Sequence, residues 1–135
     1  MKTSTYLAVM VLALIWSSNF LYDLSACPTS KKVLFNVSAY CQDSCCTGSW
    51  SDGVTASGYV IQPGDRFVAA PKKYPFGTKM VIPGYADGKV VEVKDRGGAI
   101  KAGKNGELDR LDLYFDTHQK ALNFGRKNIE VRILP

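Results

Sequence analysis

The chain has 135 residues, of which 46% are hydrophobic and 21% charged, and its formal net charge is +5. This length fits one domain with a short extra segment and excludes two domains of ordinary size. The basic excess favours an anionic partner such as a cell-wall polymer, a membrane surface or nucleic acid. No basic run is interleaved with aromatic residues, so we expect no nucleic acid partner.

The N-terminal segment is apolar and short. Lys2 precedes the uncharged run YLAVMVLALIW, residues 6–16, which is shorter than the roughly 20 residues of a transmembrane helix. This arrangement is typical of a secretory signal, although the run fits an uncleaved anchor if residues 17–22 are included. We therefore assign residues 1–26 to a signal peptide or N-terminal membrane anchor.

The tetrapeptide LSAC, residues 24–27, is similar to a bacterial lipobox, in which the cysteine becomes the lipidated first residue. Lipidation at Cys27, ordinary signal cleavage and an uncleaved anchor all stay open. Each of them places the rest of the chain outside the cytoplasm. We expect an exported protein of the periplasm or cell envelope, with membrane attachment as a lipoprotein one of the options.

Three further cysteines, Cys41, Cys45 and Cys46, follow within six residues. An exported protein can keep a disulfide, and adjacent cysteines seldom pair, so Cys41 is expected to pair with Cys45 or Cys46. The third thiol then stays free or pairs with Cys27. Zinc is the alternative, but it needs a fourth ligand, and the only histidine, His118, lies far away in sequence. We therefore predict no metal and no cofactor.

The remaining chain alternates in the pattern of short β-strands. Residues 27–35 are assigned to a linker and residues 36–135 to the folded domain, although an alternation that places Val33, Phe35 and Val37 on one face begins before residue 36. Further strands are expected at residues 59–70 (two strands around a Pro-Gly turn), 78–82, 89–93, 109–115 and 128–134.

One short helix is expected near the C-terminus, at residues 116–125. Asp116 or Thr117 supplies its N-cap and Gly125 ends it, while its packing face is formed by Ala121, Leu122 and Phe124. About seven short strands and one helix in roughly 100 residues are typical of a mainly β domain, a small closed barrel.

The strand around Asp112 has two different faces. Its apolar face is formed by Leu111, Leu113 and Phe115, and its polar face by Arg110, Asp112 and Tyr114. An acid between a base and an aromatic ring suits a polar, ring-shaped ligand. An ordinary solvated strand face is the alternative.

Asp95 ends another expected strand, on the same face as Val91 and Val93. The following glycines, Gly97 and Gly98, allow a sharp turn and a close approach to a neighbour or ligand. Asp95 either belongs to a site at the mouth of the barrel or caps this turn through backbone amides. Two carboxylates at such positions, Asp95 and Asp112, are consistent with glycoside cleavage.

Five motifs in order carry a family resemblance: VSAYC…CC, DGVTASG, AAPKKYPFGTKMVIPGY, VEVKDRGGAI and RLDLYF…ALNFG. From about residue 37 to residue 134 the chain resembles the 3D domain, named for three aspartates and found in bacterial cell-wall enzymes. It is also similar to the catalytic barrel of membrane-bound lytic transglycosylase A. The resemblance implies a six- to seven-stranded double-psi β-barrel that cleaves peptidoglycan glycan strands as a monomer.

The resemblance also implies roles for single residues. Asp112 is the catalytic acid and base, and Asp95 supports it. Asp109 and Glu107 are interpreted as loop residues. The substrate is expected to contact Tyr40, Thr55, Gly97, Gly98 and Tyr114.

Two departures from the family pattern stand out. Ala70 occupies the position of the first family aspartate, so two of the three remain. The stretch Lys101–Asp109 is about six residues longer than the usual connection, and it is expected to form a flexible loop beside the cleft. A lytic transglycosylase is the first interpretation; a hydrolytic muramidase and a non-catalytic, expansin-like wall-binding or wall-loosening barrel are the alternatives.

Overall fold

The computed structural model describes residues 29–135, which form a mainly β fold with six strands and a short helix near the C-terminus. The segment predicted to be a signal or anchor lies outside the described residues, as does Cys27. None of the helices within residues 29–135 is long and apolar enough to cross a membrane.

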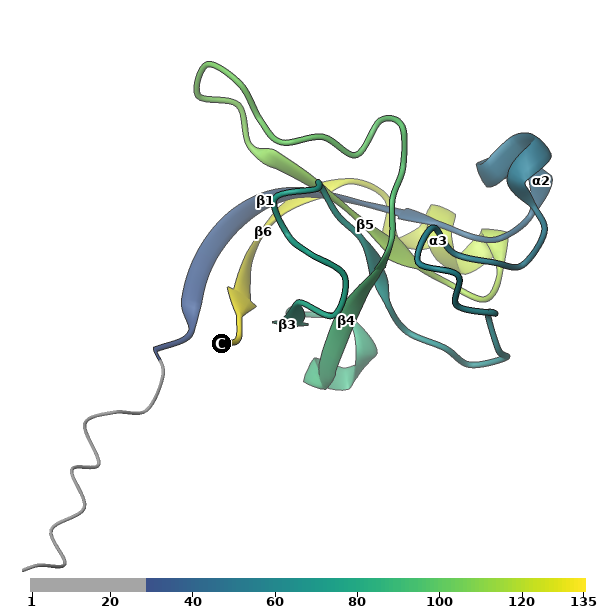
Figure 1. Cartoon of the computed structure of the whole chain (residues 1–135), viewed down its shortest axis with the longest axis horizontal. Helices are drawn as coiled ribbons and strands as arrows, with labels where there is room; N and C mark the ends of the chain where they lie inside the picture. Colours follow the sequence, from purple (N-terminus) through teal and green to yellow (C-terminus); the bar gives the residue numbers. More distant parts are fainter. Residues whose placement is uncertain (1–28) are drawn as a thin grey trace, which may run out of the picture.

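The six strands close into a barrel in the order β1-β5-β2-β4-β3-β6, and β6 pairs back onto β1. Two neighbouring pairs, β1–β5 and β2–β4, are parallel, and the other four are antiparallel. Figure 1 shows the long β1 curving beside β6. The strands are β1 (Lys31–Tyr40), β2 (Val68–Ala69), β3 (Lys79–Val81), β4 (Val90–Asp95), β5 (Asp109–Tyr114) and β6 (Lys127–Ile133).

The barrel interior is filled by the apolar face of each strand. Phe35 and Val37 of β1 are fully buried and pack with Leu111 and Leu113 of β5. The predicted alternation of these two strands is therefore confirmed. Burying a side chain of this size contributes roughly 1.5–3 kcal/mol, so this layer holds the strands in one register.

A second, smaller cluster lies on the other face of the same strands. Tyr40, Phe67, Ala69 and Tyr114 are buried together, with the rings of Phe67 and Tyr114 stacked at 4.5 Å between centroids. The Tyr85 hydroxyl lies within hydrogen-bonding distance of the carbonyls of Phe67 (3.0 Å) and Tyr114 (2.6 Å). This buried cluster packs beneath the polar residues of the cavity described below.

The strand expected at residues 59–62 was wrong. Only an isolated bridge joins Val54 and Val60 there, and Val60 is 58% exposed, so it has no buried face to occupy. The segment is instead a loop held by one carboxylate. Asp65 accepts hydrogen bonds from the Tyr59 hydroxyl (2.9 Å) and the Gln62 amide (2.8 Å).

Helix α3 (His118–Phe124) confirms the predicted helix, with Thr117 at the N-cap and Gly125, at φ 69°, just after its end. Phe124 packs against the core, but Leu122 is 59% exposed, so its assignment to the packing face was wrong. So short a helix turns only one narrow stripe toward the barrel. A second helical turn, α2 (Ser44–Thr47), was not predicted. Short 3-10 turns lie at η2 (Gly48–Trp50) and η3 (Ala86–Gly88).

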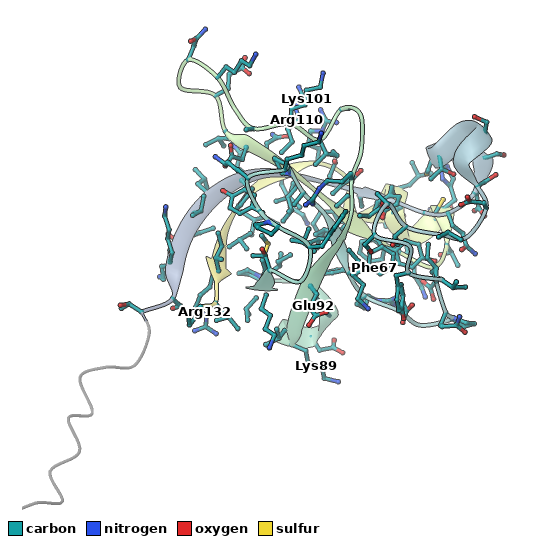
Figure 2. The ribbon with its side chains drawn as sticks, viewed as in Figure 1. Phe67, Lys89, Glu92, Lys101, Arg110 and Arg132 are labelled. Atoms are coloured by element: carbon teal, nitrogen blue, oxygen red, sulfur yellow. The ribbon has the colours of Figure 1, made fainter. Side chains whose placement is uncertain are left out.

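The connection from β4 to β5 extends away from the barrel as a long loop, at the top of Figure 1. Figure 2 places Lys101 and Arg110 next to each other at its base, at the opposite end of the view from Lys89 and Glu92. The Arg110 amide donates to the Lys101 carbonyl (3.1 Å). The insertion therefore begins and ends at one backbone contact.

Candidate active site

A cavity of about 490 Å³ opens beside the second cluster. Six of the seven predicted catalytic and substrate-binding residues line it: Tyr40, Thr55, Asp95, Gly97, Gly98 and Asp112. The seventh, Tyr114, lies outside the cavity, because its ring is buried against Phe67 beneath it. Further lining comes from Gln42, Cys46, Asp52 and Arg96.

Asp112 lies in the middle of β5, where its register partners are Ser38 of β1 and Ala69 of β2. The Ser38 hydroxyl donates to Asp112 Oδ1 at 2.9 Å. Burial raises the pKa of Asp112 to about 6; the Ser38 hydrogen bond and the charge of Arg126 oppose this, and the charge of Asp95 adds to it. A carboxyl group with this pKa can exchange a proton near neutral pH.

Asp95 is the last residue of β4 and accepts three hydrogen bonds. The donors are the Tyr40 hydroxyl (2.6 Å) and the amides of Ala56 (2.8 Å) and Arg96 (2.8 Å). Burial and the Asp95 carboxylate raise the pKa of Tyr40 well above its usual value, so its hydroxyl stays a donor. Asp95 therefore combines the two alternatives predicted from the sequence: it caps the following turn, and it lines the cavity.

The loop that contains Thr55 is attached to the end of β4. Besides the Ala56–Asp95 contact, the Ser57 amide donates to the Lys94 carbonyl (3.3 Å). Thr55 itself is buried, and its hydroxyl contacts the Ser57 hydroxyl (3.0 Å) and the Tyr59 amide (3.2 Å). These contacts show that Thr55 stabilises the conformation of the loop beside the cavity.

The two glycines after Arg96 differ in what they require. A Cβ on Gly97 would lie 2.8 Å from Ile100 Cγ1, whereas one on Gly98 would meet nothing within 4 Å. Gly97 is therefore needed for the close approach of Ile100, which packs against the second cluster. Neither glycine has a positive φ, so the close approach, and not an unusual backbone angle, explains this pair.

Arg96 was not singled out from the sequence, although it follows Asp95 directly. Its guanidinium donates to the carbonyls of Ala70 (3.0 Å) and Tyr74 (2.8 Å) and stacks 4.1 Å from the Phe76 ring centroid. Ala70, where the family pattern has an aspartate, is fully buried in the core. At this position the chain therefore offers a backbone carbonyl to Arg96 and no carboxylate to the cavity.

Asp109 is not the loop residue that we expected, because it begins β5 and is buried. Burial opposes its charge, but contacts from Lys73 (2.5 Å), the Tyr74 hydroxyl (2.7 Å) and the Gly103 amide (2.9 Å) hold the pKa of Asp109 below its usual value. It fixes the inserted loop to the barrel. Glu107, in contrast, lies exposed in that loop.

Cys46 lines the cavity, and the sulfurs of Cys41 and Cys45 lie close to that of Cys46. Among the described residues, Cys41, Cys45 and Cys46 are free thiols, so the predicted disulfide among them is not formed. The reason given against a metal was also wrong, because the structure places His118 beside them. The strand register explains why His118 lies beside the cysteines. Tyr40 and Tyr114 are register partners at the ends of the parallel strands β1 and β5, so the segments that follow them, with Cys41 and His118, start side by side.

The described residues thus form a small β-barrel with a half-buried acid and a second, hydrogen-bonded acid in one cavity. A family model of the 3D domain matches residues 66–135, which are more than half of the chain. The chain belongs to the 3D domain family. The matched region contains Asp95 and Asp112, whereas Tyr40 and Thr55 precede it. No curated protein matches the chain.

Proposed function

We propose that this protein is a peptidoglycan lytic transglycosylase, with Asp112 as its single acid and base. The observation that carries the proposal is a half-buried carboxyl group with a pKa of about 6 in a cavity of about 490 Å³. One of its oxygens, Oδ1, accepts from Ser38. The other has no hydrogen-bond partner among the described residues and is free to hold a proton toward a ligand.

The proposed reaction cleaves the glycosidic bond between N-acetylmuramic acid and N-acetylglucosamine. Protonated Asp112 donates to the bridging oxygen, and an oxocarbenium-like centre develops at C1 of the muramic sugar. The same carboxylate then removes the proton from the C6 hydroxyl of that sugar, whose oxygen bonds to C1 and closes a 1,6-anhydro ring. Because the nucleophile is part of the substrate, no second carboxylate has to activate water.

Asp95 has a supporting role in this reaction. Its negative charge raises the pKa of Asp112, which favours the acid form before cleavage. Three donors fix its position, and a fixed negative charge near a developing cation stabilises it. The hydrogen bond to Asp95 also holds Tyr40 at the wall of the cavity, where its ring can contact a sugar.

The wider setting is part of the same proposal. The net charge of +5 suits a polymer that bears peptide carboxylates, and the N-terminal segment suits an exported, cell-envelope protein, membrane-anchored or lipidated at Cys27. We also propose a double-psi barrel acting as a monomer. The two parallel strand pairs support this topology, because parallel neighbours need long crossover connections.

The alternative is a barrel that binds or loosens the wall without cleaving it. Ala70 favours this alternative, because the chain lacks the first aspartate of the family pattern and the side chain there is buried. A hydrolytic muramidase would use water as the nucleophile in place of the C6 hydroxyl, so its product has a reducing end instead of an anhydro ring.

The experiment incubates the full chain, purified in mild detergent, with peptidoglycan and identifies the released muropeptides by mass spectrometry. We expect 1,6-anhydro products, and a loss of at least about 100-fold in their release with Asp112→Asn. Asp87→Asn, an exposed acid in η3, is the matched control and should leave release unchanged. Binding without any release would overturn the enzyme in favour of the wall-binding barrel.

A further inference from the structure

Four metal-ligating side chains converge at the edge of the cavity. The sulfurs of Cys41, Cys45 and Cys46 and Nδ1 of His118 all lie within 4.8 Å of one another. They include the single histidine of the chain and every cysteine of residues 29–135. Residues 41 and 118 come from opposite ends of the domain, so sequence proximity does not explain this convergence.

The six distances between these atoms describe a small tetrahedron. The sulfur–sulfur distances are 3.1 Å for Cys41–Cys46 and 4.0 Å for the other two pairs. Nδ1 of His118 lies 3.7, 3.2 and 3.5 Å from Cys41, Cys45 and Cys46. A tetrahedral zinc ion with Zn–S of about 2.3 Å and Zn–N of about 2.05 Å would separate its ligands by about 3.8 Å and about 3.6 Å. The observed distances bracket both values.

The fold builds this arrangement from three elements. Cys41 directly follows β1, Cys45 and Cys46 lie in helical turn α2, and His118 is the first residue of α3. The Phe115 amide donates to the Tyr40 carbonyl (2.8 Å), which sets the end of β1 beside the start of the α3 segment. Figure 1 shows α2 and α3 at the same end of the molecule.

A disulfide uses only part of this cluster. Any pairing among the three cysteines joins two sulfurs and leaves the third, together with the imidazole, without a function. A metal ion engages all four atoms. Thiolate and imidazole ligands in a tetrahedral arrangement select zinc among the common divalent ions.

We propose that Cys41, Cys45, Cys46 and His118 form a structural zinc site. All four coordination positions are filled by protein, so the ion has no open position for substrate. Its effect is on the cavity wall, because Gln42, Cys46 and Thr47 line the cavity and belong to the segment that the ion fixes to α3. The wall beside the acids is thus held by the metal and not by strand pairing.

The test measures metal content of the full chain, purified in mild detergent without chelator. Plasma mass spectrometry should find one zinc per chain. Exchange for Co²⁺ should give the intense visible bands of a tetrahedral cobalt–thiolate centre. The double variant Cys45→Ser/Cys46→Ser should lose the zinc and the cobalt spectrum, His118→Gln should change that spectrum, and the matched control Cys27→Ser should keep both.

Removal of zinc should also lower Tm, because a structural ion binds the folded state preferentially. Two results would overturn the site. One is a metal-free native protein in which mass spectrometry finds a disulfide among Cys41, Cys45 and Cys46. The other is zinc that persists at one per chain in the double variant.

Discussion

Asp95 and Asp112 lie on the two strands that flank β2, and both are register partners of Ala69. β2 lies between these two strands, and its register on β4 shifts at Ala69, so that Val68 pairs with Val93 and Ala69 with Asp95. Ala69 and both acids line the active-site cavity, and Ala69 is buried. The cavity wall beside the acids therefore includes a residue that takes no part in the chemistry.

Enlarging this residue should block the site while leaving both acids in place. We expect Ala69→Val to reduce release of anhydro-muropeptides strongly, at a stability cost of about 1–3 kcal/mol. Val68→Ile adds volume to the neighbouring residue, which faces the core instead of the cavity, and is the matched control. Similar loss of activity in both variants, measured at equal folded fraction, would count against this role for Ala69.

The pH dependence of cleavage should follow the protonation of Asp112. Because the reaction needs its acid form, kcat/KM should fall as pH rises above about 6. Ser38→Ala removes a hydrogen bond that lowers this pKa, so the falling limb should move to higher pH. Asp95→Asn removes a charge that raises it, so the limb should move to lower pH, along with a loss of rate. Initial rates across a pH series test both directions, and limbs that move the opposite way would contradict the assignment.

The proposed catalytic acid should also destabilise the fold. An unfolded aspartate titrates near pH 3.9, and Asp112 in the folded state near 6. The folded state then binds more protons between these values, so stability is lost as pH rises through that range. Asp112→Asn should therefore raise stability by on the order of 1–3 kcal/mol at about pH 7 and much less at about pH 4. Thermal unfolding at the two pH values measures the difference.

Asp109 should show the opposite behaviour, although it lies only three residues away. Its pKa is lowered in the folded state, so its contribution is present at neutral pH and is lost as pH falls below the unfolded value. Asp109→Asn should cost about 1–3 kcal/mol at neutral pH, because the contacts from Lys73, Tyr74 and Gly103 favour a charged partner. A gain in stability from this variant would show that the two acids are not distinguished as the structure implies.

Gly103 in the insertion and Gly98 in the turn beside the cavity differ in the space available for an added methyl group. A Cβ on Gly103 would lie 1.9 Å from the Glu107 carbonyl oxygen, so Gly103→Ala must open the loop. We expect a lowered Tm and faster hydrogen exchange in residues 101–109. Gly98→Ala meets nothing within 4 Å and has no positive φ, so its stability should be unchanged. Equal exchange in both variants would show that the insertion is not held by this contact.

The strands with a clear apolar alternation were predictable from the sequence. Phe35 and Val37 in β1 and Leu111 and Leu113 in β5 carry that pattern, and they form the core. Residues 59–62 show a similar composition but form a loop, because polar contacts to Asp65 replace strand pairing. Composition alone does not distinguish these outcomes.

Of the residues in the site, the two acids Asp95 and Asp112 were predictable from the motifs around them. Ser38 and Ala69 were missed because their roles come from cross-strand register, which pairs residues distant in sequence. His118 was set aside for the same reason, since 72 residues separate it from Cys46 and only the closed barrel joins them. Strand register and barrel closure are tertiary properties, and no local sequence pattern predicts them.

The pairing of β1 with β6 has a consequence for how the chain reaches its folded state. It makes Lys31 and Ile133 partners, and so joins the first strand of the described residues to the last. Until β6 is available, both β1 and β3 keep an unpaired edge, and closure must then span nearly the whole domain. Such long-range contacts are typical of slow-folding domains. We therefore expect the barrel to close only when β6 is available to pair with both β1 and β3.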